Sequence, residues 1–247
     1  MSYKNHRYVL MTVDPVHIGT GGTRLGRVDL SIVREPGTNL PKIPGTALHG
    51  AIRSYAAYRY GKPRCAGLGQ PREGRKGHCG RPTCPICYTF GAVRGEDTSQ
   101  ARSGVVSIGD ARILLFPVYS MAGPVWVTCP SVLEDFGISG QRVQEGKAKW
   151  PRDLTNQGHL NLGWLMVERQ DDHWGVPDGL RAILPEPVKS RVVLISERLF
   201  SHVVNSNLEV RTSVSINPET GAAEEGALFT YEAIPRATFL WLDVIVD

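Results

Sequence analysis

Four of the chain's five cysteines lie in one short segment that is otherwise rich in glycine, proline and arginine. Their spacing is C-x13-C-x4-C-x2-C, and the segment ends in a Cys-Pro-Ile-Cys knuckle. Such a knuckle places two thiolates on one ion, and a distant pair closes a tetrahedral cage. We therefore expect Cys65, Cys79, Cys84 and Cys87 to hold a structural Zn²⁺. The metal would stabilise a loop insertion, residues 61–90, that is too polar to fold alone.

Other uses of these cysteines remain open from the sequence alone. A reducing compartment disfavours disulfides, and a redox Cys-x-x-Cys pair needs a strand before it and a helix after it. Chance clustering of structural thiols is a third alternative. His78 could replace a cysteine ligand, although a place next to the ligands or in solvent is the simpler expectation. Cys129, in an apolar run, is expected to be an inert buried thiol.

The length and hydrophobicity of the chain suit a globular protein. It has 247 residues, of which 41% are hydrophobic, enough for one large domain or two small ones. The N-terminus lacks the apolar run of a signal peptide, and no stretch approaches the roughly 18 apolar residues that span a bilayer. We expect a cytoplasmic protein without membrane contact.

Positive charge is concentrated in the same region as the cysteines. The formal net charge is +4, but residues 61–81 contain six lysines and arginines against Glu73 alone, so this window is +5 and the remainder is −1. A local basic surplus favours a polyanionic partner, because each neutralised phosphate releases a counterion. The alternatives are a loop kept solvated by its charges, or a loop that docks an acidic protein.

Residue patterns along the chain predict both strands and a helix. We expect strands at residues 7–14, 28–34, 104–120, 123–130 and 237–247, and a hairpin formed by residues 208–216 and 226–233. Thr46 is expected to cap the clearest helix. Its apolar face would consist of residues recurring at helical spacing: Leu48, Ala51, Ile52, Tyr55 and Ala56.

The start of this helix is a candidate phosphate site. Free N–H groups after Gly45, with His49 and Arg53 one and two turns further on, could hold an anion. An ordinary core helix with a surface arginine is the alternative interpretation.

Several segments together resemble one known family. They are GRVDLSIVRE, PKIPGTALHGAIR, the cysteine loop ending in YTFGA, VSIGDARILLFPVYSMAGPVWVTCP, and TSVSINPETGAAEEGALFTYEAIP. They are similar to the RAMP-superfamily backbone subunit of type III CRISPR effector complexes, nearer the Cmr branch than the Csm branch. The resemblance runs in order from about Tyr8 to Asp247 and is weakest over residues 134–190.

This resemblance implies a fold, partners and an activity. The fold would be α+β, with an RRM-like (ferredoxin-like) core in a single RAMP domain, residues 1–247, and a β-hairpin thumb at about residues 201–235. The subunit would polymerise with neighbouring copies along a CRISPR guide RNA, beside other type III effector subunits. It would be an endoribonuclease that cleaves paired single-stranded target RNA at regular intervals.

The resemblance also implies roles for single residues. Asp29, in the Gly-x-Val-Asp setting, matches the nuclease aspartate. Gly45, Thr46, His49 and Arg53, with Arg211 in the thumb, would contact RNA. His49 stands where the family usually has lysine, whereas Arg53 matches.

The expected chemistry uses the 2′-hydroxyl of the RNA as its own nucleophile. The thumb would displace a nucleotide and strain the backbone towards in-line attack. Asp29 would then hold Mg²⁺ or Mn²⁺ or accept the hydroxyl proton, and an ordinary exposed aspartate is a poor base at neutral pH. A turn aspartate that bonds its own backbone is the alternative. At the level of the whole protein, the alternatives are a catalytically inactive guide-binding scaffold and a zinc-stabilised protein-interaction module.

Overall fold

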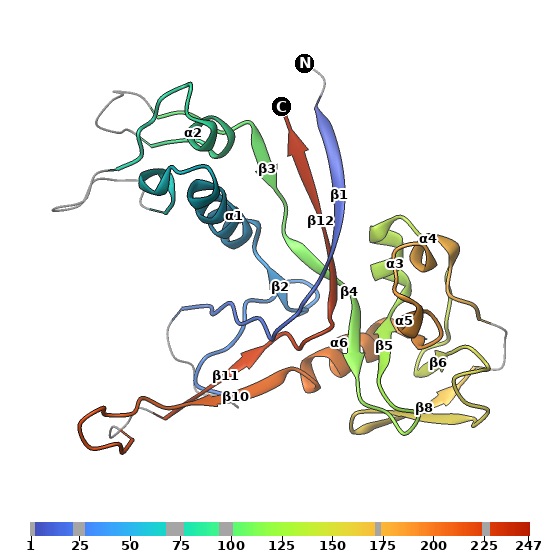
Figure 1. Ribbon diagram of the computed structural model, residues 1–247. Coiled ribbons are helices and arrows are strands. Elements are labelled where there is room, and N and C mark those ends of the chain that lie inside the picture. The colour runs from blue at the N-terminus through green and yellow to red at the C-terminus, as the bar shows by residue number, and fades with distance from the viewer. Residues whose placement is uncertain (1–2, 22–27, 68–76, 94–100, 171–173, 224–227) are drawn as a thin grey trace. The chain divides into compact units, whose positions relative to one another are not determined.

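The computed structural model describes residues 3–21, 28–67, 77–93, 101–170, 174–223 and 228–247 (Figure 1). The chain forms two compact units, each assembled from segments that are distant in the sequence. Unit 1 comprises Met1–Tyr8, Ile43–Ala111 and Leu242–Asp247, and unit 2 comprises Val9–Lys42 and Arg112–Trp241.

Unit 1 contains the helices α1 (Gly45–Arg59) and α2 (Pro85–Phe90), which lie beside each other, and the 3-10 turn η1 (Pro63–Cys65) (Figure 1). The short strand β2 (Lys42–Ile43) precedes α1. Strand β3 (Val106–Ile108) pairs antiparallel with the end of β12 (Phe239–Val246). Strand β1 (Lys4–Met11) begins in this unit, where both Nε and Nη2 of Arg7 donate to the carboxylate of Asp243 at 2.9 Å.

The start of α1 differs from the sequence expectation. Pro44 occupies the N-cap position and no side chain of the cap residue bonds the helix, so the prediction that Thr46 caps it was wrong. Instead, the N–H of Gly45 donates to Oδ1 of Asp110 at 2.7 Å. A cap from 65 residues away satisfies one of the unpaired N–H groups that every helix start presents.

The predicted apolar face of α1 was also wrong. The buried residues of the helix are Gly45, Arg53 and Ala57, whereas Ile52 and Tyr55 are exposed. The cysteine segment packs on the side of Arg53 and Ala57, and this contact makes that side the inner face. Helical spacing located an apolar stripe but could not show which side the rest of the unit covers.

Unit 2 is built on a mixed sheet. Its strands are β4 (Ala111–Val118), β5 (Val125–Thr128), β6 (Lys147–Lys149), β7 (His159–Leu162), β8 (Leu165–Arg169) and β9 (Val192–Ile195). They follow the order β12-β4-β5-β9-β6-β8-β7. The pairs β5–β9 and β6–β8 are parallel and the others reported in this order are antiparallel. The fold is therefore mixed α+β with a large mixed sheet, and strands occur within residues 134–190, for which the sequence predicted no architecture.

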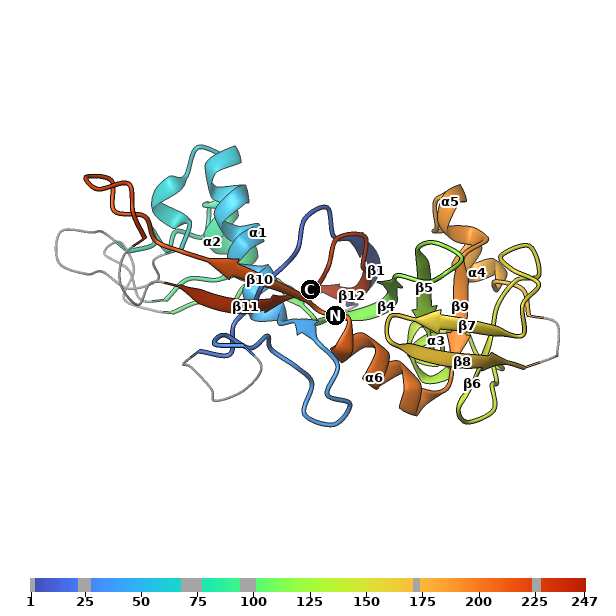
Figure 2. The same ribbon diagram turned by 90° about the horizontal axis from the view of Figure 1, so that it is seen from below.

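The core of unit 2 lies around the central strands β4 and β9, seen with β5, β7 and β8 in Figure 2. All four residues of β9 are buried, as expected of a strand covered on both faces. The helices are α3 (Pro130–Phe136), α4 (Asp178–Arg181), α5 (Glu186–Lys189) and α6 (Glu197–Ser206). In the described parts of the chain, no helix combines the length and apolar character needed to cross a bilayer.

A separate hairpin in unit 2 joins β10 (Glu209–Ser213) antiparallel to β11 (Phe229–Ala233), with Arg211 opposite Tyr231. The thumb was predicted at about residues 201–235, and the end of α6 (Glu197–Ser206) lies in the first part of that range. The predicted strand at residues 28–34 was wrong in form, since the segment makes only isolated bridges, including one from Leu30 to Tyr231 of β11.

Alanine substitutions at two glycines of α1 test how closely the start of the helix packs against the backbone after β3. A Cβ at Gly45 would lie 2.2 Å from the carbonyl oxygen of Ile108, whereas a Cβ at Gly50 would meet nothing within 4 Å. We expect Gly45→Ala to lower the free energy of unfolding by about 1–3 kcal/mol through overpacking. Gly50→Ala should leave it unchanged or raise it by roughly 0.5–1 kcal/mol, because alanine restricts the unfolded chain. Urea unfolding measures both, and equal effects would contradict the proposed close contact.

Candidate functional site

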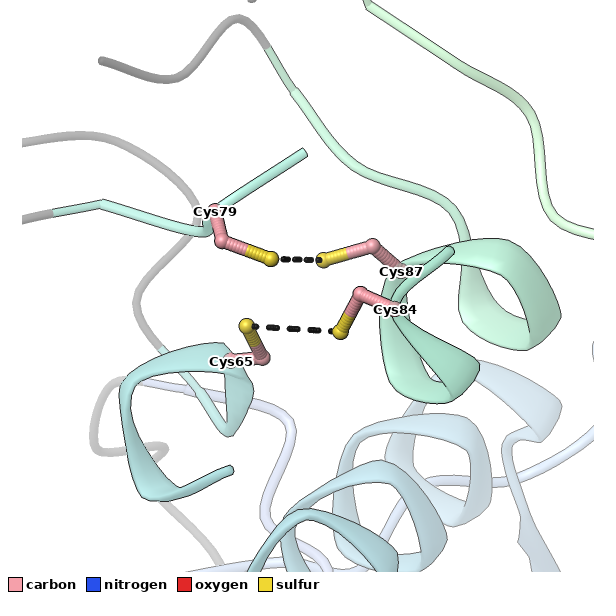
Figure 3. A group of neighbouring side chains, drawn as sticks. All are labelled: Cys65, Cys79, Cys84 and Cys87. Carbon is pink, nitrogen blue, oxygen red and sulfur yellow. Dashed lines mark hydrogen bonds between the residues drawn. The ribbon is translucent and has the colours of Figure 1, made fainter. Parts of the chain in front are cut away.

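The four cysteines of the insertion converge in unit 1 (Figure 3). Their sulfur atoms all lie within 4.8 Å of one another, although the residues come from η1, the segment before α2, and α2 itself. The Sγ atoms of Cys79 and Cys87 are 3.8 Å apart, and those of Cys65 and Cys84 are 3.9 Å apart. These separations are far too long for disulfides. A tetrahedral ion with metal–sulfur bonds of about 2.3 Å requires sulfurs about 3.8 Å apart, so the cluster has the dimensions of a metal site.

Local structure explains how the knuckle forms. Cys84 is the N-cap residue of α2, and Pro85 begins the helix, where its missing N–H costs nothing. Cys87 follows within the same short helix and is fully buried. Burial raises the pKa of the Cys87 thiol, so a metal would have to displace a proton from it.

Arg53 joins the segments that carry the cysteines. Its side chain is only 7% exposed. Its Nε donates to the carbonyl of Cys65 at 2.8 Å, and its Nη1 donates to the carbonyl of Gly91, just after α2, at 2.7 Å. Its Nη2 lies 3.0 Å from Nδ1 of His78. The guanidinium thus joins η1, His78 and the residue that follows α2, and it places a positive charge near the thiols.

His78 lies next to the cysteine cluster and outside the four-sulfur set. It is buried, and burial followed by the charge of Arg53 lowers its pKa to about 4, which keeps the imidazole neutral. His78 therefore lies beside the expected cysteine ligands, as the sequence predicted, and it contacts Arg53. Its Nε2 is buried without a hydrogen-bond partner among the described residues.

The predicted RNA contacts of α1 have different surroundings from those expected. The N–H of Gly45 is taken by Asp110, and Arg53 is committed to protein carbonyls. Thr46 is exposed in the first turn. His49 is half-buried, with its ring 5.2 Å from that of Phe90, and burial followed by the charge of Arg53 lowers its pKa.

Asp29 belongs to unit 2, where it is exposed beside the hairpin. Its Oδ2 accepts hydrogen bonds from the backbone N–H of Thr230 at 2.7 Å and from the Thr230 hydroxyl at 2.9 Å. Its other carboxylate oxygen accepts no hydrogen bond from another residue in the described ranges. The two bonds, the backbone one first, lower the pKa of Asp29. The carboxylate is therefore ionised at neutral pH, accessible, and attached to β11.

The segment that carries Asp29, residues 28–34, is held against β11 and α6 by residues that the sequence analysis did not identify. Arg34 Nη2 donates to Oε2 of Glu232 at 2.9 Å, and Arg34 Nε donates to Oδ1 of Asn205 in α6 at 2.9 Å. Glu232, on β11, is only 8% exposed, so the ion pair is largely shielded from water. No local sequence signal predicts a pairing across 198 residues.

His17 also lies against β11. Its Nδ1 is 2.5 Å from the carbonyl oxygen of Glu232, and its ring packs edge-on against Tyr231 with centroids 5.1 Å apart. Arg211, the predicted RNA contact of the hairpin, is exposed opposite Tyr231, with its Nε 3.7 Å from Glu209 Oε1. An aspartate, a histidine and an arginine therefore surround neighbouring residues of one strand.

Replacing Arg53 tests its role in the insertion. Arg53→Met would leave buried carbonyls without donors, and we expect the free energy of unfolding to fall by about 1–3 kcal/mol. Arg59→Met, at an exposed arginine of the same helix, should change it by less than about 0.5 kcal/mol. Urea unfolding followed by circular dichroism compares the two. If Arg53→Met weakens RNA binding and leaves stability unchanged, Arg53 is an RNA contact instead of a structural one.

Several known proteins are similar to this chain in sequence or in fold. A model of the RAMP superfamily matches residues 9–246. The chain is 30% identical to the CRISPR system Cmr endoribonuclease Cmr4 of Pyrococcus furiosus over 257 aligned residues, 96% of this chain and 80% of that protein.

Solved structures agree with this match. A chain of the type III-B Cmr-β complex bound to cognate target RNA superposes with a TM-score of 0.70 at 16% identity, over 99% of this chain and 84% of that one. Oligomeric Cmr4 from Pyrococcus furiosus gives a TM-score of 0.63 at 22% identity, over 100% and 82%. These two likenesses concern the fold, whereas the family model spans nearly the whole sequence. The chain belongs to the RAMP superfamily.

Proposed function

We propose that this protein is a guide-RNA-binding backbone subunit of a type III CRISPR ribonucleoprotein, and that it cleaves guide-complementary target RNA. The observation that carries the proposal is the 30% identity to the Cmr4 endoribonuclease over 96% of the chain. The exposed, ionised Asp29 beside the hairpin supports it, because the family resemblance places the nuclease aspartate at this position. The partners would be guide RNA, target RNA, neighbouring copies and other effector subunits.

Finer points of the fold belong to the same proposal. We assign an RRM-like core, a zinc-stabilised insertion at residues 61–90, and a thumb formed by β10 and β11. A protein-interaction module unrelated to CRISPR is not favoured, because the family model spans both units. A guide-binding scaffold without nuclease activity remains as an outcome of the experiment below.

The cleavage step needs little covalent chemistry from the protein. The 2′-oxygen of the target attacks the adjacent phosphorus, the bond to the 5′-oxygen breaks, and a 2′,3′-cyclic phosphate and a 5′-hydroxyl result. One proton leaves the 2′-hydroxyl and one is delivered to the 5′-oxygen, so no water is consumed in this step. The attacking and leaving oxygens must be in line, which the thumb would achieve by displacing a nucleotide.

The environment of Asp29 favours one of its two expected roles. Hydrogen bonds that lower the pKa of a carboxylate make it a weaker base, so proton abstraction by Asp29 is disfavoured. The same bonds keep the group charged and leave Oδ1 open, which suits a ligand of Mg²⁺ or Mn²⁺. When bound, such an ion would neutralise charge on the phosphate oxygens. Asp29, held by Thr230, would position this charge at the scissile phosphate.

His17 is our candidate for proton transfer. Imidazole is the side chain most often used for this purpose in enzymes. The contact between Nδ1 and the Glu232 carbonyl orients the ring against β11, two residues along the strand from the Thr230 that binds Asp29. Arg211, exposed on the neighbouring strand, would contact the RNA backbone.

Substitution of Asp29 tests the nuclease proposal. We expect Asp29→Asn to lower the target cleavage rate of the reconstituted complex by about 100-fold or more, because an uncharged amide holds a divalent ion poorly, and to leave target binding unchanged. Asp153→Asn, at an exposed aspartate of unit 2 outside the hairpin region, is the matched control and should cut normally. Both are assayed with and without added Mg²⁺.

Other outcomes contradict parts of the proposal. Normal cutting by Asp29→Asn would show that the nuclease residue lies elsewhere, and cutting that is independent of divalent ions would exclude the metal role. Target binding without cutting by the native complex would leave only the scaffold function.

Removal of thiols tests the zinc proposal. Native protein should contain about one Zn²⁺ per chain, and Cys84→Ser with Cys87→Ser should abolish it, since two sulfurs cannot close a tetrahedral site. Cys129→Ser is the control, because Cys129 lies outside the cluster, and it should retain the metal. Acidification should release Zn²⁺ as the thiolates are protonated. Elemental analysis measures the metal, and a metal-free native protein with four reactive thiols would refute the site.

A further inference from the structure

The outward side of α1 carries aromatic and basic side chains together. Tyr55 and Tyr58 are 74% and 69% exposed, and Arg59, also exposed, follows one turn after Tyr55. Residues three and four apart lie on the same side of a helix, so these three form one surface, opposite the buried Arg53 and Ala57. We call Tyr55, Tyr58 and Arg59 the α1 outer face.

A basic hollow lies past the end of the helix, on the side of the cysteine segment. Its cavity, about 320 Å³, is lined by Lys62, Arg64 and Arg81, and by backbone from Gly61, two residues after Arg59. Lys62 and Arg81 are exposed. The inner wall of the hollow includes Cys65, Cys79 and Cys84, so the cysteine site sets the position of its basic rim.

The charged side chains described around the α1 outer face and the hollow are all positive. Among the described residues from 43 to 93 there is no aspartate or glutamate, while Arg53, Arg59, Lys62, Arg64 and Arg81 all lie there. The C-terminus of a helix carries the equivalent of about half a negative charge, which the cations of the outer face and hollow exceed several-fold. The start of α1 is different, because the carboxylate of Asp110 already binds the N–H of Gly45 and opposes a second anion there.

We propose that the α1 outer face and the basic hollow form a binding site for single-stranded RNA. Tyr55 and Tyr58 would stack on bases, and Arg59, Lys62 and Arg81 would contact phosphates. Aromatic rings interleaved with cations are the arrangement that binds a flexible polyanion with exposed bases. Tyrosine and arginine are also enriched at protein interfaces, so binding of a protein to this face is tested as the alternative outcome. The proposal rests on the RNA-binding function above and moves the contact of unit 1 away from the helix start.

Two double variants of the full-length, zinc-loaded protein separate the parts of the site. The probe is a fluorescein-labelled single-stranded RNA of mixed sequence, and fluorescence anisotropy gives its affinity at several salt concentrations. Tyr55→Ala with Tyr58→Ala should weaken binding by about 30-fold or more, since two stacked bases are lost, and leave the salt dependence unchanged. Arg59→Ala with Lys62→Ala should reduce the slope of log affinity against log salt by about 1.4, since each phosphate contact on a single strand contributes about 0.7.

Matched controls lie in unit 2. Trp164→Ala removes an aromatic ring that is 95% exposed, and Arg198→Ala removes an exposed arginine of α6. Both should bind the probe as the native chain does. Zinc content is measured in every variant, so that damage to the cysteine site is recognised.

Several results would overturn the proposal. If the native chain binds the probe and both double variants bind it equally well, the site is wrong while the RNA-binding function stands. If the variants change only zinc retention, the cations serve the thiolates, and if they change only self-association by sedimentation, the face is a protein interface. If the native chain, alone and in the assembled complex, binds no RNA, the proposed function fails as well.

Discussion

The buried guanidinium of Arg53 is the interaction on which the architecture of unit 1 depends. It reaches the carbonyls of Cys65 and Gly91 and the imidazole of His78, and so ties η1, the end of α2 and the intervening segment to one helix. The insertion is poor in large apolar side chains, and its small core consists mostly of alanine and cysteine. Such a core contributes little hydrophobic stabilisation, so the insertion depends on hydrogen bonds to Arg53, and the Zn²⁺ that we propose for the cysteine cluster would stabilise it further.

This arrangement determines which surfaces of unit 1 remain for a ligand. Because Arg53 faces inward, the tyrosines on the opposite side of α1 face solvent. The carboxylate of Asp110 in turn occupies the helix start. Two surfaces are left over: the exposed tyrosines of α1, opposite the cysteine segment, and the basic hollow that the cysteines line past the end of the helix.

Unit 2 organises its candidate site around one strand. β11 supplies the hydroxyl and N–H that bind Asp29, the carboxylate that pairs with Arg34, and the ring that meets His17. The exposed aspartate therefore depends on a shielded ion pair for its position. Breaking a shielded pair leaves an uncompensated charge, and so this anchor should tolerate substitution poorly.

Local signals in the sequence determined the elements that depend on neighbouring residues. Cysteine spacing predicted the cluster, an apolar context predicted the buried Cys129, and β-branched runs predicted most strands. The inner face of α1, its cap and the form of residues 28–34 were decided by tertiary structure. Each depends on a partner far along the chain: the cysteine segment, Asp110 and Thr230. A sequence pattern records which side chains are apolar or charged, but only the folded chain determines which of them meet, because contact depends on how distant segments pack.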